Sequence, residues 1–204
     1  LCCGLGIWKH VLEKLGGTHI ASADICGDTL QAQKTLQGLS EAEGSKLINV
    51  DITIVKNWTL FLAHVIAISA PCQPFSGAGY QKGTLDHRSK PLLVIPAIAA
   101  VMGAALVIME QVPGILKTQN GQAWTDLCLI MRNLGYLVRS ELLSSQTFVP
   151  HKRKRLCATM MHLALAGNDT SIAYSRGARW LAECQSDKLV LCDTNIIEHI
   201  QYES

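Results

Sequence analysis

The sequence His64-Val65-Ile66-Ala67-Ile68 runs directly into Ser69-Ala70-Pro71-Cys72-Gln73-Pro74-Phe75. The largely apolar run predicts a short buried strand, and the residues after it predict a loop. Proline fixes φ and lacks a backbone N–H group, so Pro71 and Pro74 hold the loop rigidly around Cys72. A rigidly held thiol suits a nucleophile, although most cysteines at strand ends are small buried residues without chemistry.

The residues after this loop are small or polar. Residues 76–79 are Ser-Gly-Ala-Gly, and Gly83, Asp86, His87 and Arg88 follow. We expect this stretch to be the mobile part of a loop that closes over a substrate. Arg88 either holds a phosphate or is a solvated surface charge.

A second apolar run, residues 105–109, predicts a strand that leads into Glu110. The functional edge of a doubly wound sheet lies at the carboxyl ends of its strands. A carboxylate at this edge can hold or deliver a proton. The alternative for Glu110 is a cap of the next helix.

The N-terminal residues predict a turn between a strand and a helix. Gly4-Leu5-Gly6 precedes a helix expected over residues 8–15, and a strand expected over residues 19–25 carries Asp24 at its carboxyl end. Glycines let the backbone approach a ligand, and the start of a helix favours a carboxylate. An acid in the position of Asp24 binds ribose hydroxyls. The alternatives are a simple turn and a helix cap.

Two further segments complete the predicted sheet and its helical cover. Residues 47–52 predict a third strand near Asp51, for which the alternative is a turn or a cap. Residues 125–134 predict an amphipathic core helix. Its expected buried face consists of Leu127, Ile130, Met131 and Leu134.

The only dense basic cluster in the sequence is residues 152–155. In an extended segment, alternation places His151, Arg153 and Arg155 on one face. Two guanidinium groups on one face suit a base carbonyl, a phosphate or the carboxylate of Glu110. The alternative is a solvated basic turn.

Length and composition fit one α/β domain. The 204 residues are 49% hydrophobic and 17% charged, which indicates a globular chain that can bury a core. The net charge of +2 is too small to predict nucleic-acid binding by itself. The eight cysteines include no Cys-x-x-Cys pair and no zinc-like His and Cys spacing, so we expect no metal and a reduced, intracellular protein.

Residues 92–109 are eighteen consecutive residues without a charge. This length is at the lower edge of what could span a bilayer. Pro96 and Gly103 interrupt the run, and a buried helix over residues 92–102 followed by the strand 105–109 explains it equally well. We expect no membrane association.

Several of these motifs resemble one known family. Pro71-Cys72-Gln73 with Phe75-Ser76 resembles the nucleophile motif of the cytosine-5 DNA methyltransferases. Glu110-Gln111-Val112 resembles that family's Glu-Asn-Val, and Arg153 and Arg155 are placed as in its Gln-x-Arg-x-Arg. The order and spacing of the motifs also agree.

The N-terminal motifs extend the resemblance to the cofactor. Gly4-Leu5-Gly6 resembles the family's cofactor loop, and Asp24 resembles its ribose-binding acid. The resemblance implies a Rossmann-like S-adenosylmethionine-dependent methyltransferase fold, which is α/β with a mostly parallel sheet and helices on both faces. It also implies that the cofactor S-adenosylmethionine is bound by Gly4, Leu5, Gly6, Asp24, Ile25, Asp51 and Ile52.

The activity implied by the resemblance is transfer of a methyl group to C5 of cytosine. Cys72 would attack C6 of the base, Glu110 would contact the ring N3 and amino group, Arg155 would fix the base carbonyl and Arg153 would brace the site. DNA is the expected substrate, with tRNA the less favoured alternative. The expected location is intracellular, in the nucleus if the source is eukaryotic.

Residues 1–163 are predicted to form the catalytic domain, and residues 164–204 remain unassigned. No target-recognition domain of the family can be matched, so we expect further domains or chains to supply recognition. Ile7, Gln111 and His151 stand where the family usually has Gly, Asn and Gln. The alternative hypothesis is a catalytically inactive remnant that binds a cofactor or a partner protein.

Overall fold

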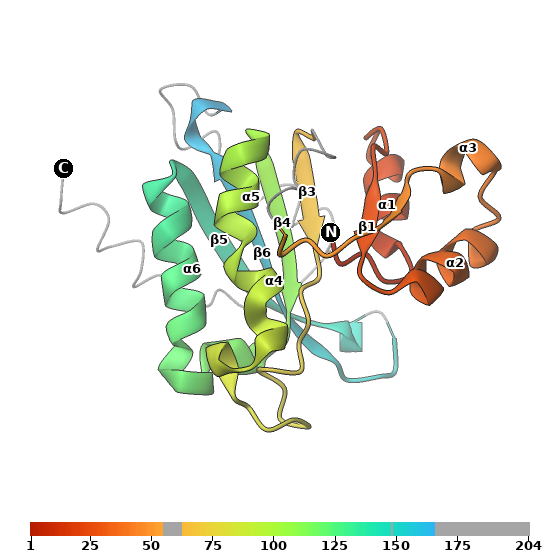
Figure 1. Ribbon diagram of the computed structural model, residues 1–204. Helices are drawn as coiled ribbons and strands as arrows, with labels where there is room; N and C mark the ends of the chain where they lie inside the picture. The colour runs from red at the N-terminus through yellow and green to blue at the C-terminus, as the bar shows by residue number, and fades with distance from the viewer. Residues whose placement is uncertain (55–62, 148, 166–204) are drawn as a thin grey trace.

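The computed structural model of the chain describes residues 1–54, 63–147 and 149–165 (Figure 1). Helices and strands alternate along the first part of the chain, as expected for an α/β protein. The helices are α1 Ile7–Lys14, α2 Gly27–Leu36, α3 Glu41–Gly44, α4 Lys90–Leu93, α5 Ile95–Met102 and α6 Gln122–Asn133. The strands are β1 Ser22–Asp24, β2 Leu47–Asn49, β3 Val65–Ile68, β4 Leu106–Gln111, β5 Tyr136–Ser144 and β6 Lys154–His162.

The described strands form two sheets. Strands β1 and β2 pair in parallel, and the second sheet has the order β3-β4-β6-β5. Strand β3 is parallel to β4, whereas β6 is antiparallel to both β4 and β5. The α/β class is therefore as expected, and the larger sheet is mixed.

The N-terminal residues lie between the two sheets and hydrogen-bond to both. The nitrogen of Leu1 donates to the carbonyl of Ala67 (2.6 Å), and the N–H group of Ser69 donates to the carbonyl of Leu1 (3.3 Å). On the other side, the N–H group of Cys3 donates to the carbonyl of Ala23 (3.1 Å). These bonds place the glycine loop that follows beside the ends of β1 and β3.

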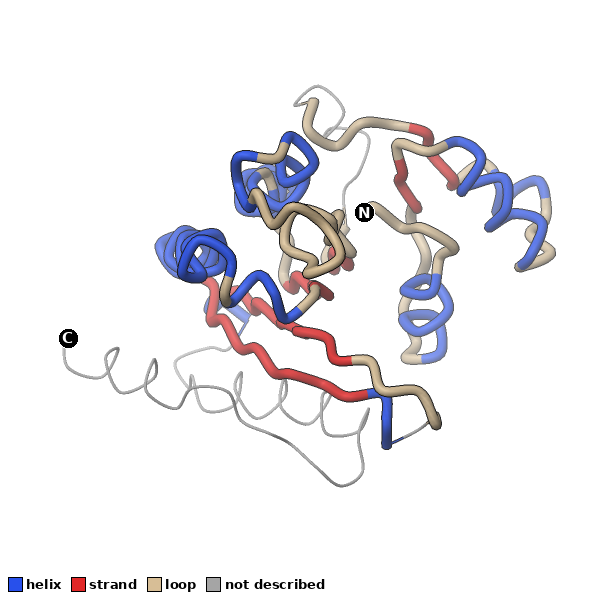
Figure 2. Tube along the Cα trace, turned by 90° about the horizontal axis from the view of Figure 1, so that it is seen from below, coloured by secondary structure: helices blue, strands red, loops and turns tan. Residues whose placement is uncertain are grey.

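Helices α4, α5 and α6 lie on one side of the four-stranded sheet, while α1, α2 and α3 surround β1 and β2 (Figures 1 and 2). The core between the sheet and these helices is apolar and includes fully buried Phe75, Ile68, Met109, Met131 and Met160. Burial of such side chains is the main favourable contribution to folding.

Helix α6 buries only part of the face expected. Ile130 is 46% and Leu134 36% exposed, whereas Leu127 and Met131 are buried as predicted. The remaining buried positions are Ala123, Trp124 and Cys128. Trp124, Leu127, Cys128 and Met131 are three or four residues apart, so they share one stripe of the helix.

The uncharged segment 92–109 contains parts of three elements: α4, α5 and β4. The helix expected over residues 92–102 is interrupted at Val94, because Pro96 has no N–H group to donate to the carbonyl of Leu92. Among the residues that the structure describes, no helix has the length and apolar character needed to cross a membrane.

Candidate active site

The predicted site residues meet in one cavity of about 610 Å³. It lies at the carboxyl ends of β1, β3 and β4, where the functional edge of an α/β sheet is expected. All but one of the predicted catalytic and cofactor residues line it; the exception is Gly6. The lining members of the predicted set are Gly4, Leu5, Asp24, Ile25, Asp51, Ile52, Cys72, Glu110, Arg153 and Arg155.

Asp24 joins the glycine loop to the start of α2. Its Oδ2 accepts a hydrogen bond from the Gly4 N–H group and its Oδ1 accepts one from the Cys26 N–H group, both at 3.0 Å. Gly6 has φ +75 and precedes the first residue of α1, a conformation that favours glycine. The loop is therefore held by its own backbone geometry and by the acid expected to bind ribose.

Two of the predicted cofactor residues, Ile25 and Ile52, give the cavity apolar walls. Ile25 is 70% exposed and Ile52 is buried, and both line the cavity.

Asp51 forms the turn that the sequence analysis gave as an alternative for this residue. Its Oδ1 accepts hydrogen bonds from the N–H (2.8 Å) and hydroxyl (2.7 Å) groups of Thr53. Strand β2 ends at Asn49, so Asp51 lies in the loop after the strand and not within it.

Cys72 is half-buried in a loop that is fixed at several points. The N–H group of Phe75 donates to the Cys72 carbonyl (3.0 Å), and that of Gly83 donates to the Pro74 carbonyl (2.9 Å). The Phe75 side chain is fully buried. Gly114 packs so closely that an added Cβ would lie 1.9 Å from the Phe75 carbonyl oxygen. The thiol therefore has a defined position on the wall of the cavity.

Glu110 and Arg155 form an ion pair in the cavity. The Glu110 Oε1 lies 2.5 Å from the Arg155 Nε, and both side chains remain about a quarter exposed. Strand β4 extends two residues further than the sequence predicted, so Glu110 is paired within the sheet, opposite Cys157 of β6. The sheet register brings a carboxylate and a guanidinium together that are 45 positions apart in sequence.

The basic segment is only partly extended. Strand β6 begins at Lys154, and the N–H group of Arg153 donates to the Ser145 hydroxyl (3.0 Å). Arg153 and Arg155 line the cavity, whereas His151 is not among the lining residues. The alternation expected of an extended segment therefore applies only from Lys154 onward, because the chain bends at His151.

Arg88 is not an isolated surface charge, because it pairs with Asp86, and its role as a phosphate ligand stays a prediction. Its Nε (3.0 Å) and terminal nitrogen (2.7 Å) bind the two oxygens of Asp86. Hydrogen bonds from Arg88 keep the pKa of the Asp86 carboxyl well below its ordinary value. No group of three or more potential metal ligands occurs within the described part of the chain.

Comparison with known proteins places the chain in a family. The family model described as C-5 cytosine-specific DNA methylase matches residues 1–173. The chain belongs to the C-5 cytosine-specific DNA methylase family. Members of this family depend on S-adenosylmethionine, so the cofactor expected from the sequence is the cofactor of the family.

Similar curated proteins are bacterial type II methyltransferases. M.BsuFI of Bacillus subtilis is 29% identical over 122 residues, which are 59% of this chain and 30% of that protein. M.HhaI of Haemophilus parahaemolyticus is 27% identical over 157 residues, which are 76% of this chain and 46% of that protein. The chain thus spans less than half the length of either methyltransferase.

Solved structures of similar fold are also methyltransferases. The Dnmt2 methyltransferase of S. pombe matches with a TM-score of 0.60 at 22% identity, over 78% of this chain and 49% of that chain. A DNA modification methyltransferase from an E. coli prophage matches with a TM-score of 0.63 at 16% identity, over 80% and 46% of the two chains. These matches confirm the Rossmann-like methyltransferase fold of this C-5 cytosine methylase family member.

The cavity fits the cofactor of the family. Each Asp24 oxygen accepts one described backbone bond, and a carboxylate oxygen has room for a second donor, such as a ribose hydroxyl. The exposed side chain of Ile25 offers apolar surface to a ring of the cofactor. The buried Ile52 lines the same cavity and adds to this apolar surface. The positive end of α1 follows the Gly4 loop and favours a carboxylate.

Several supporting residues were not identified from the sequence. Trp8 lines the cavity, and its Nε1 donates to the Ser69 hydroxyl (3.0 Å), which connects α1 to the end of β3. Gln37 Nε2 donates to the Leu5 carbonyl (2.7 Å), and Asn49 Nδ2 donates to the Ile25 carbonyl (2.9 Å). No local pattern marks these residues, because each acts on a loop distant in sequence.

Proposed function

We propose that residues 1–163 form a catalytic domain that methylates C5 of cytosine in DNA through a covalent adduct with Cys72. The observation that supports this most strongly is the shared cavity, which brings Cys72 and the Glu110–Arg155 pair next to the Asp24 loop. A nucleophile, a carboxylate that can hold the ring and a site for a methyl donor are what this reaction requires.

The proposed reaction starts with attack by the Cys72 thiolate on C6 of the base, which forms a C–S bond and shifts the electrons of the C5–C6 double bond toward C5. Glu110 holds N3 and the amino group, so that the charge developing on the ring is stabilised. Arg155 fixes Glu110 in position and offers further donors to the base carbonyl. Arg153 braces the cavity wall.

When bound, S-adenosylmethionine would supply an electrophilic methyl group to C5, and the broken S–CH3 bond would leave S-adenosylhomocysteine as the second product. Gly4 and Leu5 would hold its amino-acid part, Asp24 its ribose, and Ile25, Asp51 and Ile52 its adenine; Gly6 would act by shaping the loop. After C5 has gained the methyl group, its proton passes to water, the double bond re-forms and the Cys72 thiolate leaves. The net reaction releases one proton.

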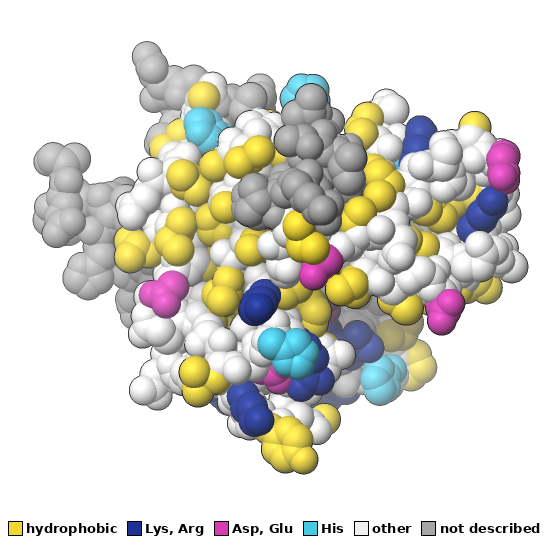
Figure 3. Space-filling model, in the orientation of Figure 1, with side chains coloured by type: hydrophobic (Ala, Val, Ile, Leu, Met, Phe, Trp, Pro, Cys, Tyr) yellow, Lys and Arg dark blue, Asp and Glu magenta, His cyan; other side chains and the backbone are white. Residues whose placement is uncertain are grey.

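DNA is the proposed substrate because the matching family model is described as a C-5 cytosine-specific DNA methylase. Exposed cations also occur close to the Cys72 loop: Lys82, Arg88 and Lys90 lie in the segment that follows it. Figure 3 shows Lys, Arg and His side chains gathered in the lower part of the face of the molecule that is seen in Figure 1. Cations contribute sequence-independent affinity for the phosphate backbone. Further recognition regions and a nuclear location remain predictions.

The test is a methyl-transfer assay with radiolabelled S-adenosylmethionine and three substrates: duplex DNA, single-stranded DNA and tRNA. A base in a duplex must be flipped out at a cost of a few kcal/mol, so single-stranded DNA serves when recognition regions are absent. The proposal predicts label in DNA that is lost in Cys72→Ser. Label in tRNA alone would overturn the choice of substrate. No label, with the cofactor bound and the chain folded, would favour the inactive alternative.

A further inference from the structure

The buried face of α2 carries a glutamine. The helix buries two side chains, Leu30 and Gln33, and Gln33 has no exposed surface. The Gln33 Oε1 accepts a hydrogen bond from the Cys3 thiol (3.5 Å), whereas its Nε2 has no partner in the described part of the chain. A buried donor without a partner lowers stability. Stability alone therefore does not explain a glutamine at this position.

The unpartnered Nε2 of Gln33 lies against the glycine loop. A Cβ atom added to Gly6 would overlap this nitrogen. Gly6 also has φ +75, a backbone conformation that favours glycine. The Gln33 amide therefore fills the space that a side chain at Gly6 would need, and it supports the loop from the side of α2.

Gln37, one helical turn after Gln33, holds the same loop by its carbonyl groups. The Gln37 Nε2 donates to the carbonyls of Leu5 (2.7 Å) and Gly6 (3.4 Å). The carbonyl and the N–H group of a trans peptide point in opposite directions. Because the Gly6 carbonyl is turned toward Gln37, the N–H group of Ile7 points away from it. Ile7 itself lines the cavity that contains the predicted cofactor residues.

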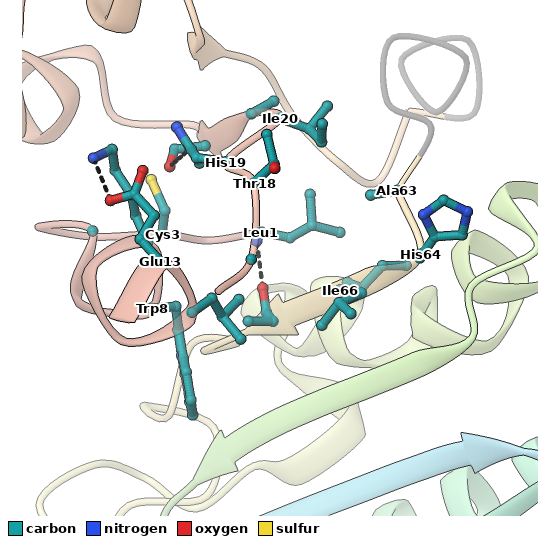
Figure 4. A pocket seen from close by; sticks show the side chains of 18 of the residues that line it. Leu1, Cys3, Trp8, Glu13, Thr18, His19, Ile20, Ala63, His64 and Ile66 are labelled. Atoms are coloured by element: carbon teal, nitrogen blue, oxygen red, sulfur yellow. Dashed lines mark hydrogen bonds and ion pairs between the residues drawn. The ribbon is translucent and has the colours of Figure 1, made fainter. Parts of the chain in front are cut away.

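The residues on either side of the loop are anchored to different elements. Figure 4 shows Cys3 before the loop and Trp8 after it, with side chains that point in different directions. Cys3 bonds to α2 through Gln33, whereas Trp8 bonds to Ser69 at the end of β3. The two glutamines of α2 act on the short backbone segment between these anchors.

We propose that Gln33 and Gln37 are positioning residues for S-adenosylmethionine. Gln33 supports Gly6, and Gln37 holds the loop carbonyls so that N–H groups of the loop face the amino-acid part of the cofactor. This inference rests on the proposed role of the glycine loop in holding that part. The two glutamines therefore affect binding of the amino-acid part and leave binding of the adenosine part, which Asp24 would hold, unchanged.

The test is titration calorimetry of the chain with two ligands: S-adenosylmethionine and methylthioadenosine, which lacks the amino-acid part. Gln37→Met keeps the length of the side chain but removes the donor. The affinity for S-adenosylmethionine should fall about tenfold, and that for methylthioadenosine should not change. Gln37→Lys supplies a donor again and should restore the affinity to within about threefold. Gln31→Met, on the exposed side of α2, is the control.

Full affinity for S-adenosylmethionine in Gln37→Met would overturn the proposal. An equal loss for both ligands would overturn it as well, because a merely structural role would weaken both, and so would an unmodified chain that binds neither ligand. No DNA is present in this experiment. A chain that binds the cofactor but does not methylate therefore contradicts the proposed function and still tests the two glutamines.

Gln33→Met separates positioning from stability at the buried residue. The variant removes the unpartnered Nε2, so the melting midpoint should not fall. The affinity for S-adenosylmethionine should nevertheless fall by about threefold or more, because Gly6 loses its polar support. A lower melting midpoint with unchanged affinity would show that Gln33 only stabilises the fold and would overturn its positioning role.

Discussion

The side-chain amide of Gln111 donates a hydrogen bond from Nε2 to the backbone carbonyl of Ala70, at 3.1 Å. Its Oε1 accepts a second bond from the N–H group of Val112, at 2.8 Å, and the side chain is almost fully buried. Ala70 is two residues before Cys72, and Gln111 directly follows Glu110. One amide therefore ties the nucleophile loop to the strand end that carries the carboxylate.

Gln111→Ala should uncouple these two groups. Loss of the amide leaves buried backbone groups unpaired, which costs about 1–3 kcal/mol of stability. A displacement of the loop by about 1 Å should lower kcat by up to about 100-fold. The measurements are methyl-transfer rate and urea unfolding, with Gln122→Ala on the exposed side of α6 as control. An unchanged kcat in Gln111→Ala would contradict this positioning role.

Gly114→Ala should disturb the same loop from the other side. The new Cβ would lie 1.9 Å from the Phe75 carbonyl oxygen, so the backbone of the Cys72 loop must move. Gly77→Ala is the control in the same loop, because its Cβ would meet only the end of Gln81, at 3.7 Å. We expect methyl transfer to fall at least about tenfold in the first variant and to remain normal in the second. Equal rates would show that the loop tolerates the displacement.

The two arginine–glutamate pairs of the sheet should respond differently to substitution. Arg155→Ala removes a partly exposed pair, so stability should change by less than about 1 kcal/mol, while kcat falls about 100-fold or more. Arg139→Ala leaves the buried Glu141 without its ion-pair partner and should cost about 3–5 kcal/mol. Denaturant unfolding and methyl-transfer rates separate the two effects. A stability loss without a kcat loss in Arg155→Ala would make that pair structural.

Stability should fall at alkaline pH because thiols are buried. Burial raises the pKa of Cys128 to about 12, from an ordinary value of 9.0. Between these values the unfolded chain releases a proton that the folded chain keeps, so the free energy of unfolding decreases as pH rises. For one thiol, the free energy of unfolding decreases by at most about 1.4 kcal/mol per pH unit. Unfolding of Cys128→Ala between pH 9 and 11 should show a shallower slope than the unmodified chain; identical slopes would contradict this account.

Much of the site could be predicted from sequence because its residues occupy strand ends. Asp24, Cys72 and Glu110 each follow or end an apolar run, and the carboxyl ends of parallel strands share one edge of a sheet. The positions of these three residues at strand ends were therefore enough to predict that they lie in one cavity. Their chemical roles came from the family resemblance and remain predictions.

The features that sequence could not predict depend on long-range packing. The buried face of α6 is decided by the elements it packs against, so Ile130 and Leu134 remain exposed despite their apolar side chains. The antiparallel pairing of β6 with β4 decides which arginine reaches Glu110, and only the register shows that it is Arg155. The break before α5 could have been predicted, because Pro96 cannot donate the required bond.

The most direct test of the central claim is capture of the covalent adduct. DNA that carries 5-fluorocytosine cannot lose a proton at C5, so the bond between Cys72 and C6 persists once the methyl group has been transferred. The account predicts a protein–DNA band on a denaturing gel that requires S-adenosylmethionine, is absent in Cys72→Ser and survives in Cys26→Ser, which removes an exposed thiol. A band that survives in Cys72→Ser, or no band from a folded chain that binds the cofactor, would contradict it.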